Sequence, residues 1–374
     1  MSDLTLILLA AGDSSRFELP VKKQWLRIEH DPLWLYVTNR LKKSGFFKNI
    51  VITAHRDEVK FMQMLCDEKI VSGGSTRQES LNNALKHVTS KYVMVSDIAR
   101  SCVDFSLIEK LISCKENADV IVPALSVTDT VVYHNETIAR ENVKLLQTPQ
   151  LSLSQKLKEA LQSESEFTDE SSAIVANGGS RKLIEGTLGA HKITYVRDLL
   201  TLACLKKPSK VSLIGNGFDI HAFEDAKPMV LCGVRVDSPF GFKAHSDGDV
   251  AIHSLIDALL GAAGLGDIGM LFPDNDNKYA GIDSKKLLHV TIKKLRDFGF
   301  EIANIDITIV AETPRLSSYK DEMRRVLAEV IQLPQGRINI KATTTEKLGF
   351  IGRKEGVGVY ATASLYYFDW TTEE

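Results

Sequence analysis

A short polar break divides this chain into two parts. Residues 206–210 read Lys-Lys-Pro-Ser-Lys, and a proline among charged residues is a poor continuation of a helix or of a central strand. The chain has 374 residues, more than an ordinary single domain of about 100–200 residues. We therefore predict two domains, residues 1–207 and residues 208–374.

The first part alternates short apolar runs with amphipathic segments. This alternation is typical of an α/β fold with a mainly parallel sheet and helices on both faces. The predicted strands are 4–10, 49–53, 92–96 and 119–123, and the predicted helices include 78–87 and 105–114.

The second part has longer helical patterns and strands that are less regularly placed. We predict an α+β sandwich for it. The predicted helices are 249–263, 284–297 and 318–332, and the predicted strands are 211–214, 304–311, 337–342 and 358–368.

Composition excludes several classes of protein. The 46 basic and 48 acidic residues give a net charge of −2, which argues against nucleic-acid binding by bulk charge. The apolar stretch 4–11 is too short to cross a bilayer and lacks the basic segment of a signal peptide. From the net charge and the short apolar stretch we expect no nucleic-acid or membrane partner. The five cysteines form no CxxC pair, so we expect buried or free thiols in a reducing cytoplasm.

The first predicted strand ends in a turn of small residues, 11–15. Backbone N–H groups can approach a triphosphate closely at such a turn, because no large side chain blocks them. Arg16 and Lys23 follow and can neutralise charge that develops at a phosphorus atom during transfer. The segment matches neither the P-loop nor the GxGxxG fingerprint. On its own it also fits a simpler interpretation, a strand and turn with solvated cations.

Further segments favour a nucleotide site. Residues 73–80, Gly-Gly-Ser-Thr-Arg-Gln-Glu-Ser, form a second glycine turn that opens a helix. Asp97 ends a predicted strand, where an α/β sheet places metal ligands and substrate contacts, although a lone aspartate is more often a helix cap. Thr148-Pro149-Gln150 and Thr168-Asp169-Glu170 lie downstream without a local explanation.

Together these motifs resemble those of the 2-C-methyl-D-erythritol 4-phosphate cytidylyltransferases, over residues 3–205. The resemblance implies a nucleotidyltransferase-like fold and the transfer of CMP from CTP to the substrate phosphate, with release of pyrophosphate. The chain departs from the family's usual pattern at four positions. Ser14 and Lys22 replace a glycine and a proline, and Ser96 and Ser101 replace a histidine and a proline.

The resemblance also implies roles for individual residues. Arg16 and Lys23 would stabilise the transition state, and Asp97 would bind Mg²⁺ and position the substrate. Arg140, reaching across a dimer, and Lys192 would hold the substrate phosphate, and Thr168 its hydroxyls. The residues implied to hold the cytidine nucleotide are Ala10, Ala11, Gly12, Gly74 and Ser80.

The second part begins with a strand followed by Asp219 and His221. Residues two apart on a strand face the same side, so both side chains can bind one cation. His253 lies on a predicted helix shortly after. One aspartate and two histidines leave a fourth position open, as expected of a working Zn²⁺ site. Coincidence would explain Asp-x-His alone, but His245 and Ser246 nearby favour a metal.

Two later segments offer groups for phosphates. Residues 265–274 form a turn-rich loop with two carboxylates. Residues 341–353 contain three consecutive threonines, Glu346 and Arg353, which supply hydroxyls, a hard-metal ligand and a bidentate phosphate clamp. The threonines could simply be strand residues, but the charged residues beside them favour binding.

These motifs resemble those of the 2-C-methyl-D-erythritol 2,4-cyclodiphosphate synthases, over residues 210–368. In that family, the 2-phosphate of 4-diphosphocytidyl-2-C-methyl-D-erythritol 2-phosphate attacks the β-phosphate, closes a ring and expels CMP. The resemblance implies Zn²⁺ at the three ligands above and Mg²⁺ or Mn²⁺ at Glu346, with His245, Ser246 and Thr344 near the transition state. It assigns Ala311 and Arg315 to cytidine binding from a neighbouring subunit. The other implied binding residues are Asp267, Gly269, Phe272, Asp274, Thr343, Thr345, Phe350 and Arg353.

The two resemblances predict a bifunctional enzyme of the non-mevalonate isoprenoid route, a nucleotidyltransferase and a phosphorus–oxygen lyase. A kinase step separates the two reactions, and the sequence supports no kinase partner, so channelling is not implied. Family dimers and trimers together imply a homo-oligomer, a hexamer or larger. Three rivals stay open: a first part of other specificity, a first part that is only a scaffold beside an active cyclase, and a zinc hydrolase with His245 as base.

Overall fold

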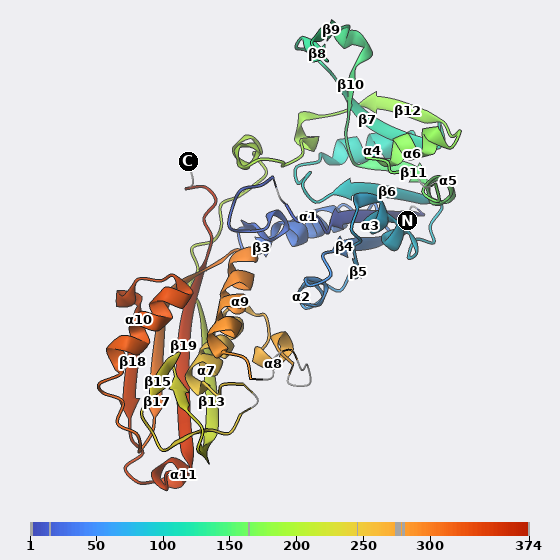
Figure 1. Ribbon diagram of the computed structural model, residues 1–374. Helices are drawn as coiled ribbons and strands as arrows, with labels where there is room; N and C mark the ends of the chain where they lie inside the picture. Colours follow the sequence, from blue (N-terminus) through green and yellow to red (C-terminus); the bar gives the residue numbers. More distant parts are fainter. Residues whose placement is uncertain are drawn as a thin grey trace. The chain divides into compact units, whose positions relative to one another are not determined.

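The computed structural model describes residues 3–14, 16–163, 165–244, 246–273, 278 and 281–372 (Figure 1). They form two compact units, Pro208–Asp369 and the rest of the chain. The expected second domain, 208–374, is therefore wrong at its C-terminal end. Trp370 is only 5% exposed and its Nε1 donates to the carbonyl of Arg27 at 2.8 Å, so it belongs to the first unit.

The first unit is built on an eight-stranded sheet. Its strands are β1 (Leu4–Ala10), β4 (Asn49–Ala54), β5 (Lys69–Ser72), β6 (Tyr92–Asp97), β7 (Val120–Ser126), β10 (Lys144–Leu146), β11 (Gln150–Leu153) and β12 (Arg181–Glu185). The order is β10-β7-β11-β6-β1-β4-β5, with β12 paired to β7. Strands β5, β4, β1 and β6 are parallel neighbours. The strand order changes direction at β1, and such a switch point is where open α/β sheets bind ligands.

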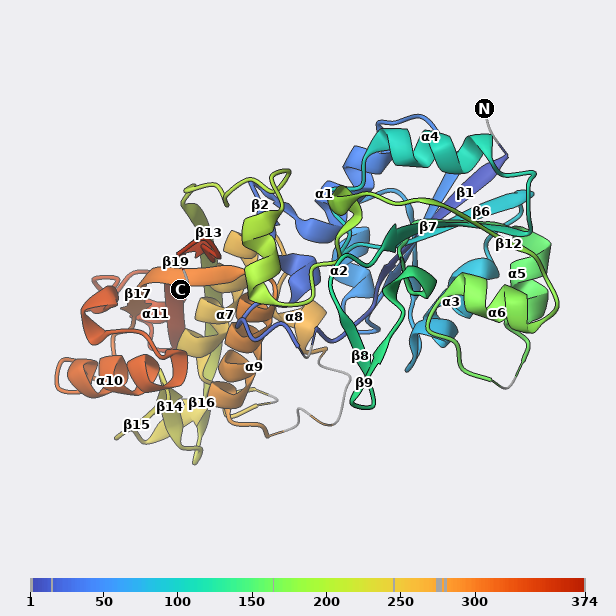
Figure 2. The ribbon, with the colours of Figure 1, turned by 90° about the horizontal axis from the view of Figure 1, so that it is seen from above.

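Helices cover both faces of this sheet, as Figure 2 shows. Helices α3 (Arg77–Leu85), α5 (Ser154–Ala160) and α6 (Glu170–Ala176) pack on one face, and α1 (Leu33–Lys42) and α4 (Phe105–Ser113) lie on the other. Every residue of β1 is buried, which is typical of a parallel strand covered on both sides. The predicted α/β architecture is confirmed.

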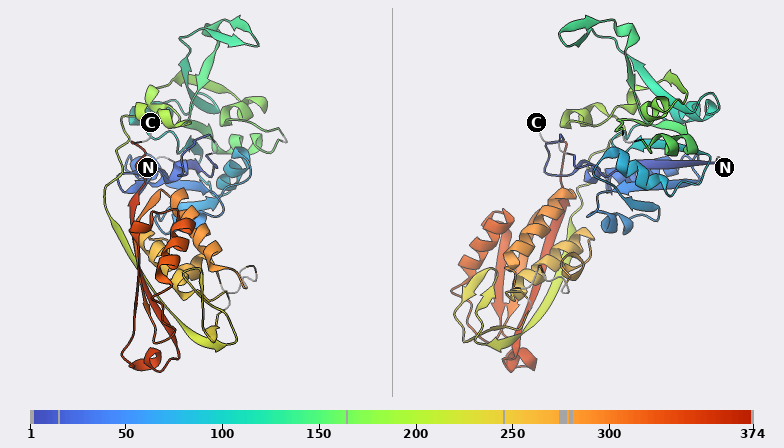
Figure 3. Two further views of the ribbon diagram at one scale, coloured as in Figure 1. Left: turned by 60° about the vertical axis from the view of Figure 1, so that its left-hand side comes forward. Right: turned by 45° about the vertical axis from the view of Figure 1, so that its right-hand side comes forward.

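The first unit also contains short elements that carry or flank the site. Strands β8 (Val131–Tyr133) and β9 (Glu136–Ile138) form a hairpin that projects from the unit (Figure 3). The side chains of Val132 and Tyr133 on it are 61% and 64% exposed. The others are η1 (Lys23–Trp25), β2 (Arg27–Ile28), β3 (Asp31–Pro32), α2 (Val59–Gln63), η2 (Arg140–Asn142), η3 (Leu188–Ala190) and η4 (Val196–Thr201).

The second unit is a two-layer sandwich, which confirms the predicted sheet-and-helix domain. Its sheet has the order β16 (Phe240–Phe242), β13 (Leu213–Asp225), β19 (Gly356–Tyr367), β17 (Phe300–Val310) and β18 (Ile338–Thr343). Helices α7 (Val250–Ala263), α9 (Ser284–Asp297) and α10 (Lys320–Ile331) contact these strands, and Figure 3 shows them on one side. The smaller elements are β14 (Met229–Leu231), β15 (Val234–Val236), α8 (Ile268–Leu271), η6 (Gln335–Arg337) and α11 (Gly349–Gly352). Among the described residues, no helix combines the length and the apolar character needed to span a bilayer.

Strand β13 is much longer than the predicted strand 211–214, which is wrong in its extent. Two glycines lie inside it, and they serve packing rather than termination. A Cβ atom on Gly217 would overlap the carbonyl oxygen of Ser254, and one on Gly215 would overlap the backbone at Ala258. Since only glycine permits this approach, α7 lies directly against β13.

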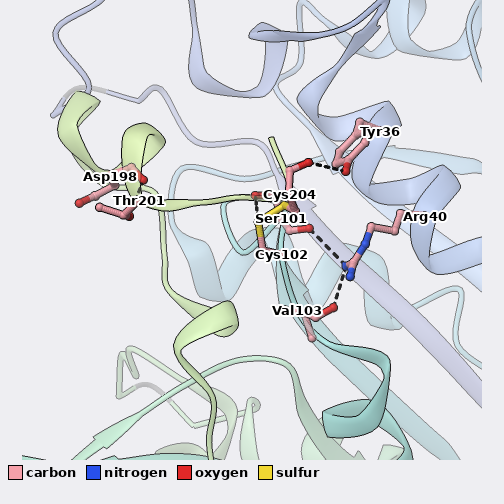
Figure 4. The surroundings of a disulfide bond; sticks show 8 residues. All are labelled: Tyr36, Arg40, Ser101, Cys102, Val103, Asp198, Thr201 and Cys204. Atoms are coloured by element: carbon pink, nitrogen blue, oxygen red, sulfur yellow. Dashed lines mark hydrogen bonds between the residues drawn. A yellow bond between two sulfur atoms is a disulfide. The ribbon is translucent and has the colours of Figure 1, made fainter. Parts of the chain in front are cut away.

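The expectation that the cysteines are buried or free thiols is wrong for two of the five. Cys102 and Cys204 form a disulfide in the first unit (Figure 4). Cys102 follows β6, and the segment after β12 returns to it, so residues 102 positions apart in sequence meet in space. Beside the bond, Arg40 donates to the carbonyl of Val103 at 2.7 Å and Tyr36 donates to that of Cys204 at 3.0 Å.

The Cys102–Cys204 disulfide predicts how many cysteine thiols react with a thiol reagent. Protein purified without reductant should show three reactive thiols in denaturant, from Cys66, Cys114 and Cys232, and five after reduction. A double Cys102→Ser, Cys204→Ser variant should show three in both conditions and unfold at lower temperature, because closing a loop of this length stabilises by about 4–5 kcal/mol. Five reactive thiols in the unreduced parent protein would contradict the pairing.

Candidate active sites

A cavity of about 460 Å³ opens at the switch point of the first unit's sheet. Ala10, the last residue of β1, and Asp97, the last residue of β6, both line it. The structure thus brings expected site residues from four separate segments of the chain to one place. Those that line the cavity are Ala10, Ala11, Gly12, Arg16, Lys23, Gly74, Ser80, Asp97 and Lys192.

The backbone of two loops forms one wall of this cavity. The N–H of Ala10 donates to Thr53 Oγ1 at 3.2 Å, and the N–H of Gly74 donates to Ser80 Oγ at 3.0 Å. A Cβ atom on Gly73 would overlap that of Ala11, so the two loops touch only because this position is glycine. Thr76 caps the following helix α3 by accepting from the N–H of Glu79. This wall presents backbone and small side chains, as a phosphate site requires.

Cationic side chains gather on another wall. Lys23 Nζ donates to the carbonyl of Ile193 at 2.8 Å. Burial, together with the charges of Lys192 and Arg16, lowers the pKa of Lys23 to about 8, against an opposing effect of Asp97. Three cations close enough to repel one another form a site that favours a polyanion.

Asp97 is a buried carboxylate held between two cations. Lys192 Nζ lies 3.0 Å from its Oδ2, and Arg77 Nε lies 3.6 Å from its Oδ1. Burial alone would raise the pKa of Asp97, but the charges of Arg77 and Lys192 and the hydrogen bond from Lys192 lower it below its usual value. The carboxylate therefore stays ionised, which suits it to a divalent cation or a substrate hydroxyl.

The sequence interpretation missed Arg77 and Glu170. Arg77 Nη1 donates to Glu170 Oε1 at 2.7 Å, and the side chain of Glu170 is fully buried. Burial raises the pKa of Glu170, against the charge of Arg77 and its hydrogen bond. Both residues stand inside motifs that the sequence displayed, Gly-Gly-x-x-Arg-x-x-Ser and Thr-Asp-Glu, but nothing local shows that they meet.

Two expected residues of the first site are not among those that line the cavity. Arg140 lies in η2, where its Nη1 donates to the carbonyl of Thr128 at 2.6 Å. Thr168 precedes the Asp169 cap of α6. Within one chain, the structure therefore does not bring either residue to the site.

The second unit holds a cluster that suits a transition metal. Asp219 and His221 lie on β13, and His253 lies on α7. Their ligand atoms all fall within 4.8 Å of one another. Asp219 Oδ2 lies 3.2 Å from His221 Nε2 and 3.5 Å from His253 Nδ1. One carboxylate and two imidazoles are the ligands of open Zn²⁺ sites, so these donors fit the expected ion.

Each histidine of the cluster is oriented through its other ring nitrogen. His221 Nδ1 lies 2.9 Å from the carbonyl of Gly248. His253 Nε2 lies 3.0 Å from Ser284 Oγ, which in turn donates to Asp247 Oδ1 at 2.6 Å. Contacts of this kind fix the tautomer so that the lone pair of the first nitrogen points to the metal. Ser246 Oγ also lies 3.2 Å from His253 Nε2, so this expected residue is at the site.

The expected phosphate segment after β18 is folded as a separate turn. Glu312 Oε1 accepts from the N–H groups of Thr345 and Lys347 at 3.0 Å each, and Thr344 Oγ1 donates to Glu346 Oε1 at 2.8 Å. Arg353 pairs with Glu355 at 2.7 Å. In the described part of the chain, no hydrogen bond or ion pair joins this segment to the metal cluster. The remaining members of the segment are Thr343, at the end of β18, and Phe350, in α11.

The other expected residues of the second site have diverse settings. Asp267 caps α8 by accepting from the N–H of Met270 at 2.8 Å, and Gly269 lies in that helix. Phe272 and Ala311 are buried, and Arg315 is exposed. His245 and Asp274 lie outside the described residues.

Known proteins match both units and the whole chain. The 2-C-methyl-D-erythritol 4-phosphate cytidylyltransferase family matches residues 4–205, and the YgbB family matches residues 212–366. A "Bifunctional enzyme IspD/IspF" of Sulfurimonas denitrificans is 60% identical, covering 98% of this chain and 95% of the relative. One of Aliarcobacter butzleri is 53% identical over 99% of both. The solved structure of the bifunctional IspDF from Campylobacter jejuni is 49% identical with a TM-score of 0.89, covering 99% of this chain and 100% of that one.

The chain belongs to the bifunctional IspD/IspF family. It is an enzyme of isoprenoid-precursor synthesis with a cytidylyltransferase unit and a cyclodiphosphate synthase unit, so the predicted pair of activities is confirmed. The rival interpretation of the first half as a mere scaffold has no support from these matches.

The low pKa of Lys23 predicts a pH dependence for the IspD half. The ammonium form is present below about pH 8 and is lost above it, so kcat/KM for CTP should fall about tenfold per pH unit on the alkaline side. Arginine keeps its charge there, so a Lys23→Arg variant should show a flat profile between pH 8 and 9.5, whatever its absolute rate. The same alkaline limb in both proteins would show that another group titrates.

Proposed function

We propose that the cavity of the first unit transfers CMP from CTP to 2-C-methyl-D-erythritol 4-phosphate. The observation that carries this proposal is the convergence of nine expected residues on one cavity at the switch point of the sheet. Its wall of backbone and small side chains allows a triphosphate to approach closely, and its cations suit the charge of two phosphorylated substrates.

In this reaction a substrate phosphate oxygen attacks the α-phosphorus of CTP, and the bond to the β-phosphate breaks to release pyrophosphate. Arg16 and Lys23 line the cavity and hold the charge that develops on the phosphate oxygens. Lys192 and Asp97 form an ion pair, in which Lys192 positions the incoming phosphate and Asp97 would hold the Mg²⁺ that accompanies CTP. Arg140, which this cavity lacks, is proposed to reach the substrate phosphate from a partner subunit, and Thr168 is proposed to contact the substrate hydroxyls.

We propose that the second unit cyclises 4-diphosphocytidyl-2-C-methyl-D-erythritol 2-phosphate. The 2-phosphate oxygen attacks the β-phosphorus, and the bond to the α-phosphate breaks to release CMP. A Zn²⁺ ion held by Asp219, His221 and His253 would supply a Lewis acid for the diphosphate. Glu346 is proposed to hold Mg²⁺ or Mn²⁺. Because nucleophile and electrophile belong to one molecule, holding the substrate in the right conformation supplies much of the rate.

Self-association is part of this proposal. The β8–β9 hairpin exposes Val132 and Tyr133, and the sheet face of the second unit exposes Ile214, Phe218 and Tyr360, each at least 48% accessible. Exposed apolar groups on regular elements favour contact with other copies. We propose dimers through the first unit and trimers through the second, hence a hexamer or larger, and a cytoplasmic location where CTP is available. Native mass spectrometry of the whole chain tests the assembly.

The two activities can be tested separately in one protein. With CTP, 2-C-methyl-D-erythritol 4-phosphate and Mg²⁺, the chain should release pyrophosphate and no CMP. With the cyclase substrate, it should release CMP and cyclic diphosphate in equal amounts. Asp97→Asn should lower only the first rate, by about 100-fold or more, and Asp219→Asn only the second. CMP without the cyclic product would indicate a hydrolase, and equal use of UTP would indicate another nucleotide specificity.

The contact between His253 and Ser284 predicts an effect on metal affinity. Ser284→Ala removes the hydroxyl that orients the imidazole, so Zn²⁺ affinity, measured by competition with a chromogenic chelator, should fall about 10- to 100-fold. Ser254→Ala is the matched control, since Ser254 is a buried serine on α7 whose hydroxyl bonds the carbonyls of Gly217 and Val359 instead. Equal Zn²⁺ affinity in both variants would show that Ser284 does not orient His253.

A further inference from the structure

A buried carboxylate lies beneath the first cavity without being part of its lining. The side chain of Glu58, which follows β4 at the start of α2, is 1% exposed. Glu58 is not among the described residues that line the cavity. A buried carboxylate is costly unless its oxygens are paired, so its partners indicate what it does.

Among the described residues, the hydrogen-bond partners of the Glu58 side chain come from one short stretch of chain. Its Oε1 accepts from Lys22 Nζ at 2.6 Å, and its Oε2 accepts from Gln24 Nε2 at 3.1 Å and Trp25 Nε1 at 2.9 Å. Gln24 and Trp25 are themselves buried, at 2% and 0% exposure. The one residue of this stretch that does not bond Glu58 is Lys23. Glu58 thus holds the chain on both sides of Lys23.

The stretch needs such an anchor. Residues 23–25 form the single 3-10 turn η1, which has no side-chain cap, and a turn this short gains little stability from its own hydrogen bonds. Lys23 lines the cavity and donates to the carbonyl of Ile193. With its neighbours bonded to Glu58, Lys23 remains directed to the ligand space.

Gln24 also connects Glu58 to the loop that follows β1, which contains Gly12 and Ser14. Its Nε2 lies 3.4 Å from the carbonyl of Gly12, and its Oε1 accepts from Ser14 Oγ at 3.2 Å. One amide therefore links Glu58 to the loop that follows β1. A shift of the turn would also move this loop.

We propose that Glu58 is a positioning residue for cytidylyl transfer, which holds the Lys22–Trp25 turn so that Lys23 faces the reacting phosphates. The proposal rests on the role proposed for Lys23 above. Glu58 acts through its neighbours and touches no substrate.

The test uses the whole chain, because its cyclase activity reports the concentration of intact protein. Glu58→Gln keeps the shape of the side chain but cannot pair with the Lys22 ammonium. We expect its kcat for pyrophosphate release to fall about 10- to 100-fold, since displacement of a catalytic group by about 1 Å can cost 100-fold. The cyclase rate should stay within about twofold of the parent. Glu68→Gln is the matched control, because Glu68 pairs with Lys42 at 2.6 Å away from the cavity.

A double-mutant cycle separates positioning from general stabilisation. If Glu58 acts mainly through Lys23, Glu58→Gln should lower kcat much less in a Lys23→Met background than in the parent, whereas a structural role would lower it by the same factor in both backgrounds. An unchanged kcat in Glu58→Gln, with a reduced one in Lys23→Met, would overturn this inference alone. An unchanged kcat in Lys23→Met would overturn the proposed role of Lys23 instead. If Glu58→Gln does not fold, Lys22→Gln decides: we expect at least about a fivefold loss of kcat, and no loss would overturn the inference.

Discussion

The buried carboxylate of Asp97 is the charge on which the first active site depends. Its side chain is only 12% exposed, so it stays ionised only with cations beside it, and Lys192 and Arg77 supply them. The cations of the site also depend on Asp97. Lys192 and Arg16 disfavour the charged form of Lys23, whereas Asp97 favours it. Without Asp97, the repulsion among these three cations would be opposed less strongly.

The topology of the sheet explains how distant residues meet at this charge. Asp97 ends β6, Arg77 begins α3 and Lys192 follows β12, and the ion pair with Lys192 spans 95 positions. Parallel strands present their carboxyl ends at one edge, so the loops after β1 and β6 share it. Glu170, on α6, forms an ion pair with Arg77. The network is therefore a consequence of strand order rather than of any local sequence.

Sequence reasoning succeeded where the signal was local and failed where it depended on tertiary contacts. Strand β1, the turn after it and the Asp219–His221 pair could be predicted because each is a short local pattern, and further motifs in the sequence favoured the functional interpretation of the turn and of the pair. The Cys102–Cys204 bond, the Arg77–Glu170 pair and the anchor at Glu58 join residues far apart in sequence, and no periodicity reveals them. The length of β13 was underestimated because glycine usually marks a strand end, whereas Gly217 here admits a helix.

The two units provide positive charge for phosphate groups in different ways. The first offers the chain's own cations, Lys23 among them, while the second offers ligands for metal cations at Asp219 and its two histidines. Under the proposed roles, the first activity depends on the charge of Lys23, whose pKa is lowered by burial and by neighbouring cations, and the second depends on the supply of metal and the orientation of two imidazoles. Each unit has its own sheet, and each group of site residues comes from one unit, so the two chemistries use different side chains. One chain can thus carry two reactions that are not consecutive, with each site tuned by itself.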